Sequence, residues 1–233
     1  TLKYVPECTV IDNTKKLSYE ADAYFLRALY YSQMVALWGP LPYNSEPITE
    51  INTTPVRQPE SEMYKHILDD LKQAMGNYKN AGIMTQASAT GEGRGYYYSA
   101  EALYAREALY AASWLGANSI DGYDNLYSIA LNASKDVIAY SGASLYSRYS
   151  DTWNLNNEEN NKECLFRVHY SNTLSSGFDN CVPYRFTDNG TGEYNSLLTR
   201  RGYGENGGSA SLLMFVPLWN NGANDLGGSG TKN

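Results

Sequence analysis

The residues best suited to ligand chemistry lie in the last third of the chain, where aromatic rings and arginines are spaced among glycine, asparagine and serine. A tyrosine or tryptophan ring has a flat apolar face and a polar edge, and an arginine presents a fork of N–H donors. Such groups can stack on a sugar ring and bond its hydroxyl or acid groups. The candidate ligand-binding residues are Tyr184, Arg185, Tyr194, Arg200, Arg201, Tyr203 and Trp219, with Trp153 as an outlying member.

Tyrosine is also the outlier of the composition, with 22 residues against 5 phenylalanines. A ring with a polar tip suits half-wet surfaces, and it suits the recognition of sugars and peptides. Each single tyrosine also has the simpler alternative of packing between helices or within a loop. The excess therefore favours a binding protein without identifying which tyrosines bind.

The residue patterns of catalytic and metal sites are missing. The two histidines, His66 and His169, belong to no zinc-binding spacing, and no nucleophile elbow occurs. Residues 202–207 match the glycine pattern of a dinucleotide fingerprint, but no predicted strand precedes them and no helix follows. Residues 188–193 are rich in oxygen ligands but lack EF-hand spacing, so Ca²⁺ binding stays open. We expect neither an enzyme nor a cofactor.

Charge and hydropathy exclude two classes of partner. A net charge of −7 with no basic stripe argues against nucleic acid, which binds through neutralised phosphates. No apolar run is long enough to span a bilayer, so any membrane anchor is expected outside this sequence. The three cysteines, Cys8, Cys164 and Cys181, form no C-x-x-C pair, and the sequence does not decide whether Cys164 and Cys181 pair.

Four segments have helical periodicity, and they cover residues 18–38, 59–78, 98–115 and 123–140. Ser18 is the expected N-cap of the first, and Gly39-Pro40 ends it. The third is rich in alanine, which lets a neighbouring helix approach closely, so we expect it in the centre of the fold. Gly142 is the expected residue after the C-cap of the fourth.

These segments predict a mainly α fold of two antiparallel, tetratricopeptide-like helix pairs followed by a loop-rich C-terminal region. Residues 1–142 are expected to form the helical scaffold, with an inserted loop at 39–58. Residues 143–233 are expected to form the loop-rich ligand-binding region, with a short strand at 165–170.

Several blocks, in their order and spacing, resemble the SusD/RagB family of nutrient-binding proteins. The helix at 20–31 and the turn at 38–43 resemble its first conserved helix and exit, and the block at 62–74 resembles its second helix. Gly93-Arg94 and the alanine-rich segment at 105–111 resemble the third, although Tyr96, Tyr97 and Tyr98 replace its usual small and basic residues. Further matches extend the resemblance to residues 17–170.

The resemblance implies a binding subunit without catalysis. Such proteins are lipoproteins on the outer face of the outer membrane, where they cover a SusC-like TonB-dependent transporter barrel and deliver oligosaccharides, or in some members peptides. The lipidated cysteine would precede Thr1. Two alternatives stay open: a peptide-binding member of the family, and a cytoplasmic tetratricopeptide-like adaptor suggested by the helix pairs alone.

Overall fold

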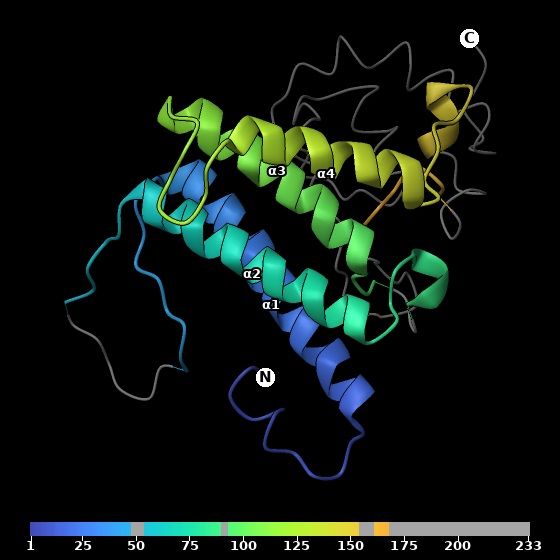
Figure 1. The fold of residues 1–233 in the computed structure, drawn as a ribbon, viewed down its shortest axis with the longest axis horizontal. Coiled ribbons are helices and arrows are strands. Elements are labelled where there is room, and N and C mark those ends of the chain that lie inside the picture. The colour runs from blue at the N-terminus through green and yellow to red at the C-terminus, as the bar shows by residue number, and fades with distance from the viewer. Residues whose placement is uncertain (48–53, 90–92, 154–160, 168–233) are drawn as a thin grey trace, which may run out of the picture. The chain divides into compact units, whose positions relative to one another are not determined.

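The computed structural model of this chain describes residues 1–47, 54–89, 93–153 and 161–167. The described residues fall into two units. Residues 1–145 with 162–167 belong to the first, which holds every α-helix of the described part, and residues 146–153 with 161 belong to the second. The elements are α1 (Asn13–Trp38), α2 (Glu60–Asn80), η1 (Gln86–Ser88), α3 (Tyr97–Leu115), α4 (Leu126–Tyr140) and η2 (Tyr149–Trp153) (Figure 1).

Helix α1 begins five residues before the predicted start. Its N-cap is Asp12, whose carboxylate accepts a hydrogen bond of 2.9 Å from the backbone N–H of Lys15. The prediction of Ser18 as the cap is therefore wrong, because an aspartate one turn and a half upstream already satisfies a free N–H group. Ser18 is instead buried inside the helix. The end at Trp38 is as predicted, and Gly39 leaves the helix with a positive φ of 68°.

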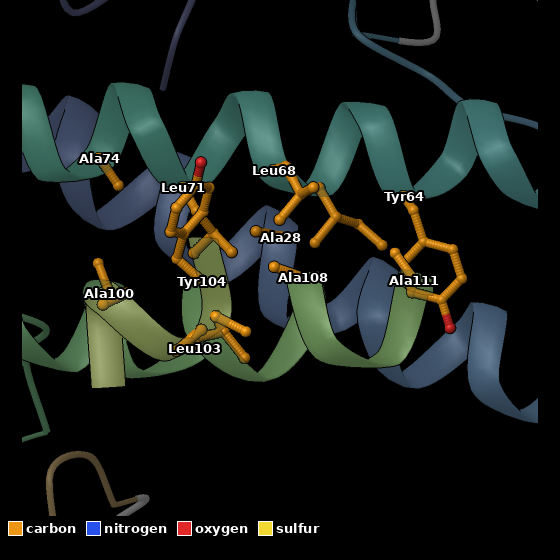
Figure 2. Close-up of a cluster of buried hydrophobic side chains, with 14 of the residues drawn as sticks. Ala28, Tyr64, Leu68, Leu71, Ala74, Ala100, Leu103, Tyr104, Ala108 and Ala111 are labelled. Atoms are coloured by element: carbon orange, nitrogen blue, oxygen red, sulfur yellow. The ribbon is translucent and has the colours of Figure 1, made fainter. Parts of the chain in front are cut away.

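Helix α2 packs its apolar face against both α1 and α3. Met63, Ile67, Leu68 and Leu71 are each no more than 1% exposed. Burial of each such side chain contributes about 1.5–3 kcal/mol to the hydrophobic stabilisation of the fold. Figure 2 shows the α2 side chains pointing towards α3, whose facing positions are largely small. The labelled α3 residues are Ala100, Leu103, Tyr104, Ala108 and Ala111.

Helices α3 and α4 form the second pair through small residues and a short connection. Ala130 and Ala133 of α4 are buried on this side of the helix. Gly116 ends α3 in the left-handed conformation, with φ at 62°, as is common after a helix. Gly142, with φ at 79°, follows the C-cap of α4 as predicted. The alanines allow the two helices to lie close together.

A short segment after α4 returns to the first helix. The ring of Phe166 meets that of Phe25 edge to face, with centroids 4.9 Å apart. The backbone N–H of Ser144 donates to the carbonyl of Lys162 at 3.0 Å. Residues 165–167 form no strand, so this part of the predicted strand is wrong, and residues 168–170 lie outside the described part. The phenylalanine pair, rather than strand pairing, holds this segment on the helices.

Consecutive helices are the principal packing partners, from α1 on α2 through α3 on α4. The prediction of a mainly α fold of tetratricopeptide-like helix pairs is confirmed. Within the described residues, no helix combines the length and apolar character needed to cross a bilayer.

Candidate functional site

A polar centre of the helical unit is built around an ion pair between α1 and α2. Arg27 donates from Nε to Oδ2 of Asp70 at 2.7 Å and from Nη2 to Oδ1 at 2.6 Å. The two side chains are 20% and 7% exposed. These hydrogen bonds raise the pKa of Arg27 above its ordinary value, so the guanidinium is a fixed charge. A two-point bond of this kind sets the orientation of the fork as well as its charge.

Aromatic rings surround the Arg27 guanidinium. Its central carbon lies 5.5 Å from the ring centroid of Tyr24 and 5.5 Å from that of Tyr43. Tyr43 in turn stacks on His66 with ring centroids 3.9 Å apart and planes 3° from parallel, and its centroid is 4.9 Å from that of Tyr31. Burial raises the pKa of Tyr43, so its hydroxyl stays neutral. The rings of Tyr24 and Tyr43 both lie within cation–π distance of the arginine and restrict its movement.

Side chains of this centre also hold the loop between α1 and α2. Tyr31 and Arg27 hold its start, and His66 contacts its end. The hydroxyl of Tyr31 accepts from the backbone N–H of Asn44 at 3.0 Å, and Arg27 Nη1 donates to the carbonyl of Ser45 at 3.3 Å. At the other end, Gln58 N–H donates to the carbonyl of Leu41 at 2.8 Å. The side chain of Gln58 lies 3.0 Å from His66 Nε2. The loop is therefore anchored to the helices at its start and its end.

A cleft of about 520 Å³ opens beside this centre. Its lining comes from residues 1–3, from Ala23, Tyr24 and Arg27 of α1, and from residues 44–47 of the loop. The volume lies in the roughly 300–1,000 Å³ range of small-molecule sites. Its walls present hydrogen-bonding groups of both kinds. No group of three potential metal ligands occurs in the described ranges.

A second polar network joins α1, α2 and the turn before α3. Asp22 accepts from the hydroxyl of Tyr78 at 2.7 Å and forms an ion pair with Arg94, which also donates to Ser18 Oγ at 2.8 Å. Burial raises the pKa of Tyr78, which is fully enclosed. A side chain at Gly95 would place its Cβ 2.2 Å from the Tyr78 hydroxyl. Arg94 and Gly95 of this turn therefore have a structural role, because they pack the turn against α1 and α2.

Glu101, in α3, is the one buried side chain in the described part whose oxygen lacks a partner. Its Oε2 makes no hydrogen bond, while Oε1 accepts a long one of 3.4 Å from Tyr97. Burial is the main cause that raises the pKa of Glu101 to about 7, and the negative charge of Asp136 adds to it. A carboxyl group in such a setting holds its proton near neutral pH.

The structure describes the place of only one predicted ligand-binding residue. Trp153 is the last residue of η2. Tyr184, Arg185, Tyr194, Arg200, Arg201, Tyr203 and Trp219 lie outside the described residues, as do the oxygen-rich stretch at 188–193 and Cys181. Cys8 and Cys164 are free thiols. The assignment of the seven loop residues stays a prediction.

The sequence analysis missed the centre around Arg27. Tyr24 and Arg27 lie in a block assigned to the scaffold, and the ring of Tyr43 was not connected with His66. A tyrosine three residues before an arginine on one helix face was the available signal. Asp70 follows directly on Asp69 in the sequence, and adjacent carboxylates on a helix point apart, but only the structure shows that Asp70 is 5% exposed and paired with Arg27 across the helices.

Comparison with known proteins identifies relatives of one kind. A family model described as "Starch-binding associating with outer membrane" (SusD-like) matches residues 4–78. SusD-like protein P25 of Formosa agariphila is 24% identical over 171 residues, which cover 72% of this chain and 29% of that protein. The crystal structure of a SusD-like protein of Bacteroides fragilis is 26% identical in sequence and has a TM-score of 0.54. The match covers 69% of this chain and 29% of that protein.

A laminarin-binding SusD-like protein also shares the fold, at 21% identity. Its TM-score is 0.65, over 80% of this chain and 40% of that protein. This chain therefore spans less than a third of the curated relative from Formosa agariphila and well under half of both solved structures. The likeness covers the helices that hold the Arg27 centre, since the family model includes all of α1 and most of α2.

Proposed function

This chain is SusD-like, and from that premise we propose that the protein is a cell-surface subunit that binds oligosaccharides and delivers them to a SusC-like TonB-dependent transporter barrel. The resemblance predicted from the sequence is confirmed by the family match and by the relatives of the same kind. Binding without catalysis follows as part of the proposal. The proposed place is the extracellular face of the outer membrane, with a lipid anchor upstream of this sequence.

The observation that carries this proposal is the agreement between the family match and the paired-helix scaffold. The matching family is described as starch-binding and associated with the outer membrane. A protein with the same fold binds laminarin, which is also a neutral glucan. The high tyrosine content and the arginine-bearing loops offer the stacking faces and N–H forks that a sugar requires.

The proposed ligand-binding residues are the eight aromatic and arginine side chains predicted from the sequence, with Tyr203 and Trp219 as the principal anchors. Loss of a stacking ring removes both apolar contact and orientation. We expect Trp219→Ala and Tyr203→Ala each to weaken oligosaccharide affinity about tenfold, equivalent to roughly 1.4 kcal/mol. Isothermal titration calorimetry with laminarin oligosaccharides and maltooligosaccharides measures this effect.

The matched control is Tyr127→Ala, because Tyr127 is a half-exposed tyrosine on α4 that belongs to none of the proposed sites. It is expected to bind as the unaltered chain does. Unchanged affinity in both Trp219→Ala and Tyr203→Ala would contradict the assignment of the loop residues. Binding of a peptide pool, with no response to any oligosaccharide, would instead favour the peptide-binding alternative.

The transporter partner is proposed from the family resemblance and has its own test. The protein is co-expressed with a SusC-like barrel from the same genome, extracted in detergent and purified through a tag on the barrel. Copurification in a stoichiometric complex is the expected result. Recovery of the barrel without the protein, when both are present in the same membrane, would contradict the proposed partnership.

A further inference from the structure

We propose that the cleft beside Arg27 is an additional subsite for a neutral, hydroxyl-rich ligand, namely one or two rings of an oligosaccharide. The site belongs to the helical unit, whereas the residues predicted to bind ligand lie after residue 152. The identity of the ligand as a sugar rests on the proposed function above. The existence of a polar subsite rests on the geometry of the cleft itself.

Arg27 retains hydrogen-bonding capacity towards the cleft that it lines. Its guanidinium has five N–H donors. Two bond Asp70 and one bonds the carbonyl of Ser45, so two make no hydrogen bond to the part of the chain that the structure describes. The ion pair with Asp70 fixes the direction of these donors before a ligand arrives. A preorganised donor loses little entropy on binding, which is how a small cleft can hold a small polar ligand.

Other residues of the cleft lining add groups that accept and donate hydrogen bonds. The hydroxyl of Tyr24 and the side chains of Asn44 and Ser45 form no hydrogen bonds within the described part of the chain. Asn44 and Ser45 are exposed, yet their backbones are held by Tyr31 and Arg27. The loop therefore presents its side chains from a fixed backbone. Several unpaired polar groups at fixed positions match the closely spaced hydroxyls of a sugar.

The charge of the lining selects a neutral ligand over an anion. The positive side chains are Lys3 and Arg27, and the latter is already neutralised by Asp70. Glu46, on the loop, also lines the cleft and carries a charge opposite to that of Lys3. No uncompensated side-chain charge remains to attract a phosphate or a carboxylate, although N–H donors are present. The N–H donors of the lining can therefore bond hydroxyl groups, which accept and donate hydrogen bonds without needing a counter-charge.

The test uses the full chain with three probes: maltooligosaccharides, laminarin oligosaccharides and inorganic phosphate. The variant is the double substitution Asn44→Ala with Glu46→Gln, which leaves the anchoring backbone N–H of residue 44 in place. We expect titration calorimetry to show at least a threefold loss of oligosaccharide affinity. We also expect amide NMR shifts at residues 44–47 of the unaltered chain on addition of the sugar.

The matched control is Asn80→Ala with Glu62→Gln, two exposed residues of α2 outside the cleft. It should bind as the unaltered chain does. If the cleft variant keeps full affinity and no shift appears at residues 44–47, while Trp219→Ala loses affinity, the subsite is wrong and the proposed function survives. If no oligosaccharide binds at all, both fail. Phosphate binding at residues 44–47 tighter than sugar binding would overturn the neutral-ligand proposal.

Discussion

Three side-chain pairs cross from α1 to α2, whereas α3 makes one side-chain hydrogen bond to α2, from Trp114 to Glu60, and otherwise packs mainly through alanines. The crossing pairs are Arg27 with Asp70, Asp22 with Tyr78, and Glu20 with Asn77. Directional bonds such as these set the rotation and register of one helix against the other. Alanine contacts set only the distance between helices. The first pair thereby holds side chains at defined positions, and the cleft is lined by α1 of that pair together with residues 1–3 and 44–47.

The second helix pair shows what happens where polar groups lack such partners. Glu101 is as buried as Asp70, but no arginine faces it, and its pKa rises to about 7. Burial raises the pKa of Asp70 as well, but the Arg27 guanidinium, which bonds its carboxylate in two places, opposes that shift. Two acidic side chains of equal burial thus have different roles. One organises a polar centre, and the other is a proton-holding group inside a packing surface.

The largest expected effect comes from removing one side of the crossing ion pair. Asp70→Ala leaves the half-buried Arg27 guanidinium without its counter-charge, which costs up to about 3–5 kcal/mol of unfolding free energy. Denaturant unfolding at pH 7 measures it. An effect below roughly 1 kcal/mol would show that the pair does not organise the first helix pair.

The next prediction concerns the pH dependence introduced by Glu101. Its folded pKa of about 7 lies above the ordinary value of 4.5, so stability is full below pH 4.5 and is lost as the pH rises to 7. In that window the unfolded chain has released a proton that the folded chain keeps. Glu101→Gln should therefore add up to about 3 kcal/mol at pH 8 and almost nothing at pH 4.

Unfolding curves of both proteins at pH 4, 6 and 8 provide the measurement for Glu101→Gln. Asp136→Asn is the matched comparison, because it removes the neighbouring charge and leaves the buried carboxyl in place. It should produce a smaller gain in the same direction. A stability difference independent of pH would contradict the role assigned to the Glu101 proton.

A third prediction tests the packing of α3. Ala108→Leu adds three carbons where α3 faces α2 at a fully buried alanine, and overpacking typically costs about 1–3 kcal/mol. Thermal unfolding measures the loss. Ser113→Leu, on the exposed side of the same helix, is the control and should be nearly neutral. Equal effects at the two positions would mean that close helix approach is not what the alanines provide.

The smallest effect is expected at an exposed ion pair on the same helix as Asp70. Lys65 lies 3.1 Å from Asp69, with the two side chains 27% and 46% exposed. Water and salt screen such a pair, so Lys65→Met should change stability by at most about 1 kcal/mol, and by less in high salt. A loss as large as that of Asp70→Ala would erase the distinction between buried and exposed pairs.

The sequence predicted the helices well because their signals are local. The apolar spacing from Tyr64 to Tyr78 and the Gly39-Pro40 stop each act within a few residues. The early start of α1 was missed because several residues can cap a helix, and the cap that is used depends on the chain before it. Boundaries were therefore less predictable than the presence of the helices.

The Arg27 centre could not be predicted because its partners are distant in the sequence. Asp70 lies 43 residues from Arg27, and periodicity shows that both are on helices but not which faces meet. Once α1 and α2 are paired, the contact is unavoidable. The aromatic and arginine residues after residue 168 present the opposite case, since the composition of that segment suggests binding without indicating any geometry.

The central claim is that this protein binds neutral oligosaccharides, and the most direct measurement is titration calorimetry of the full chain with laminarin oligosaccharides, maltooligosaccharides and a mixed peptide pool. We predict saturable binding of at least one neutral oligosaccharide and no saturable binding of the peptides. Saturable peptide binding together with no response to either glucan would contradict the account.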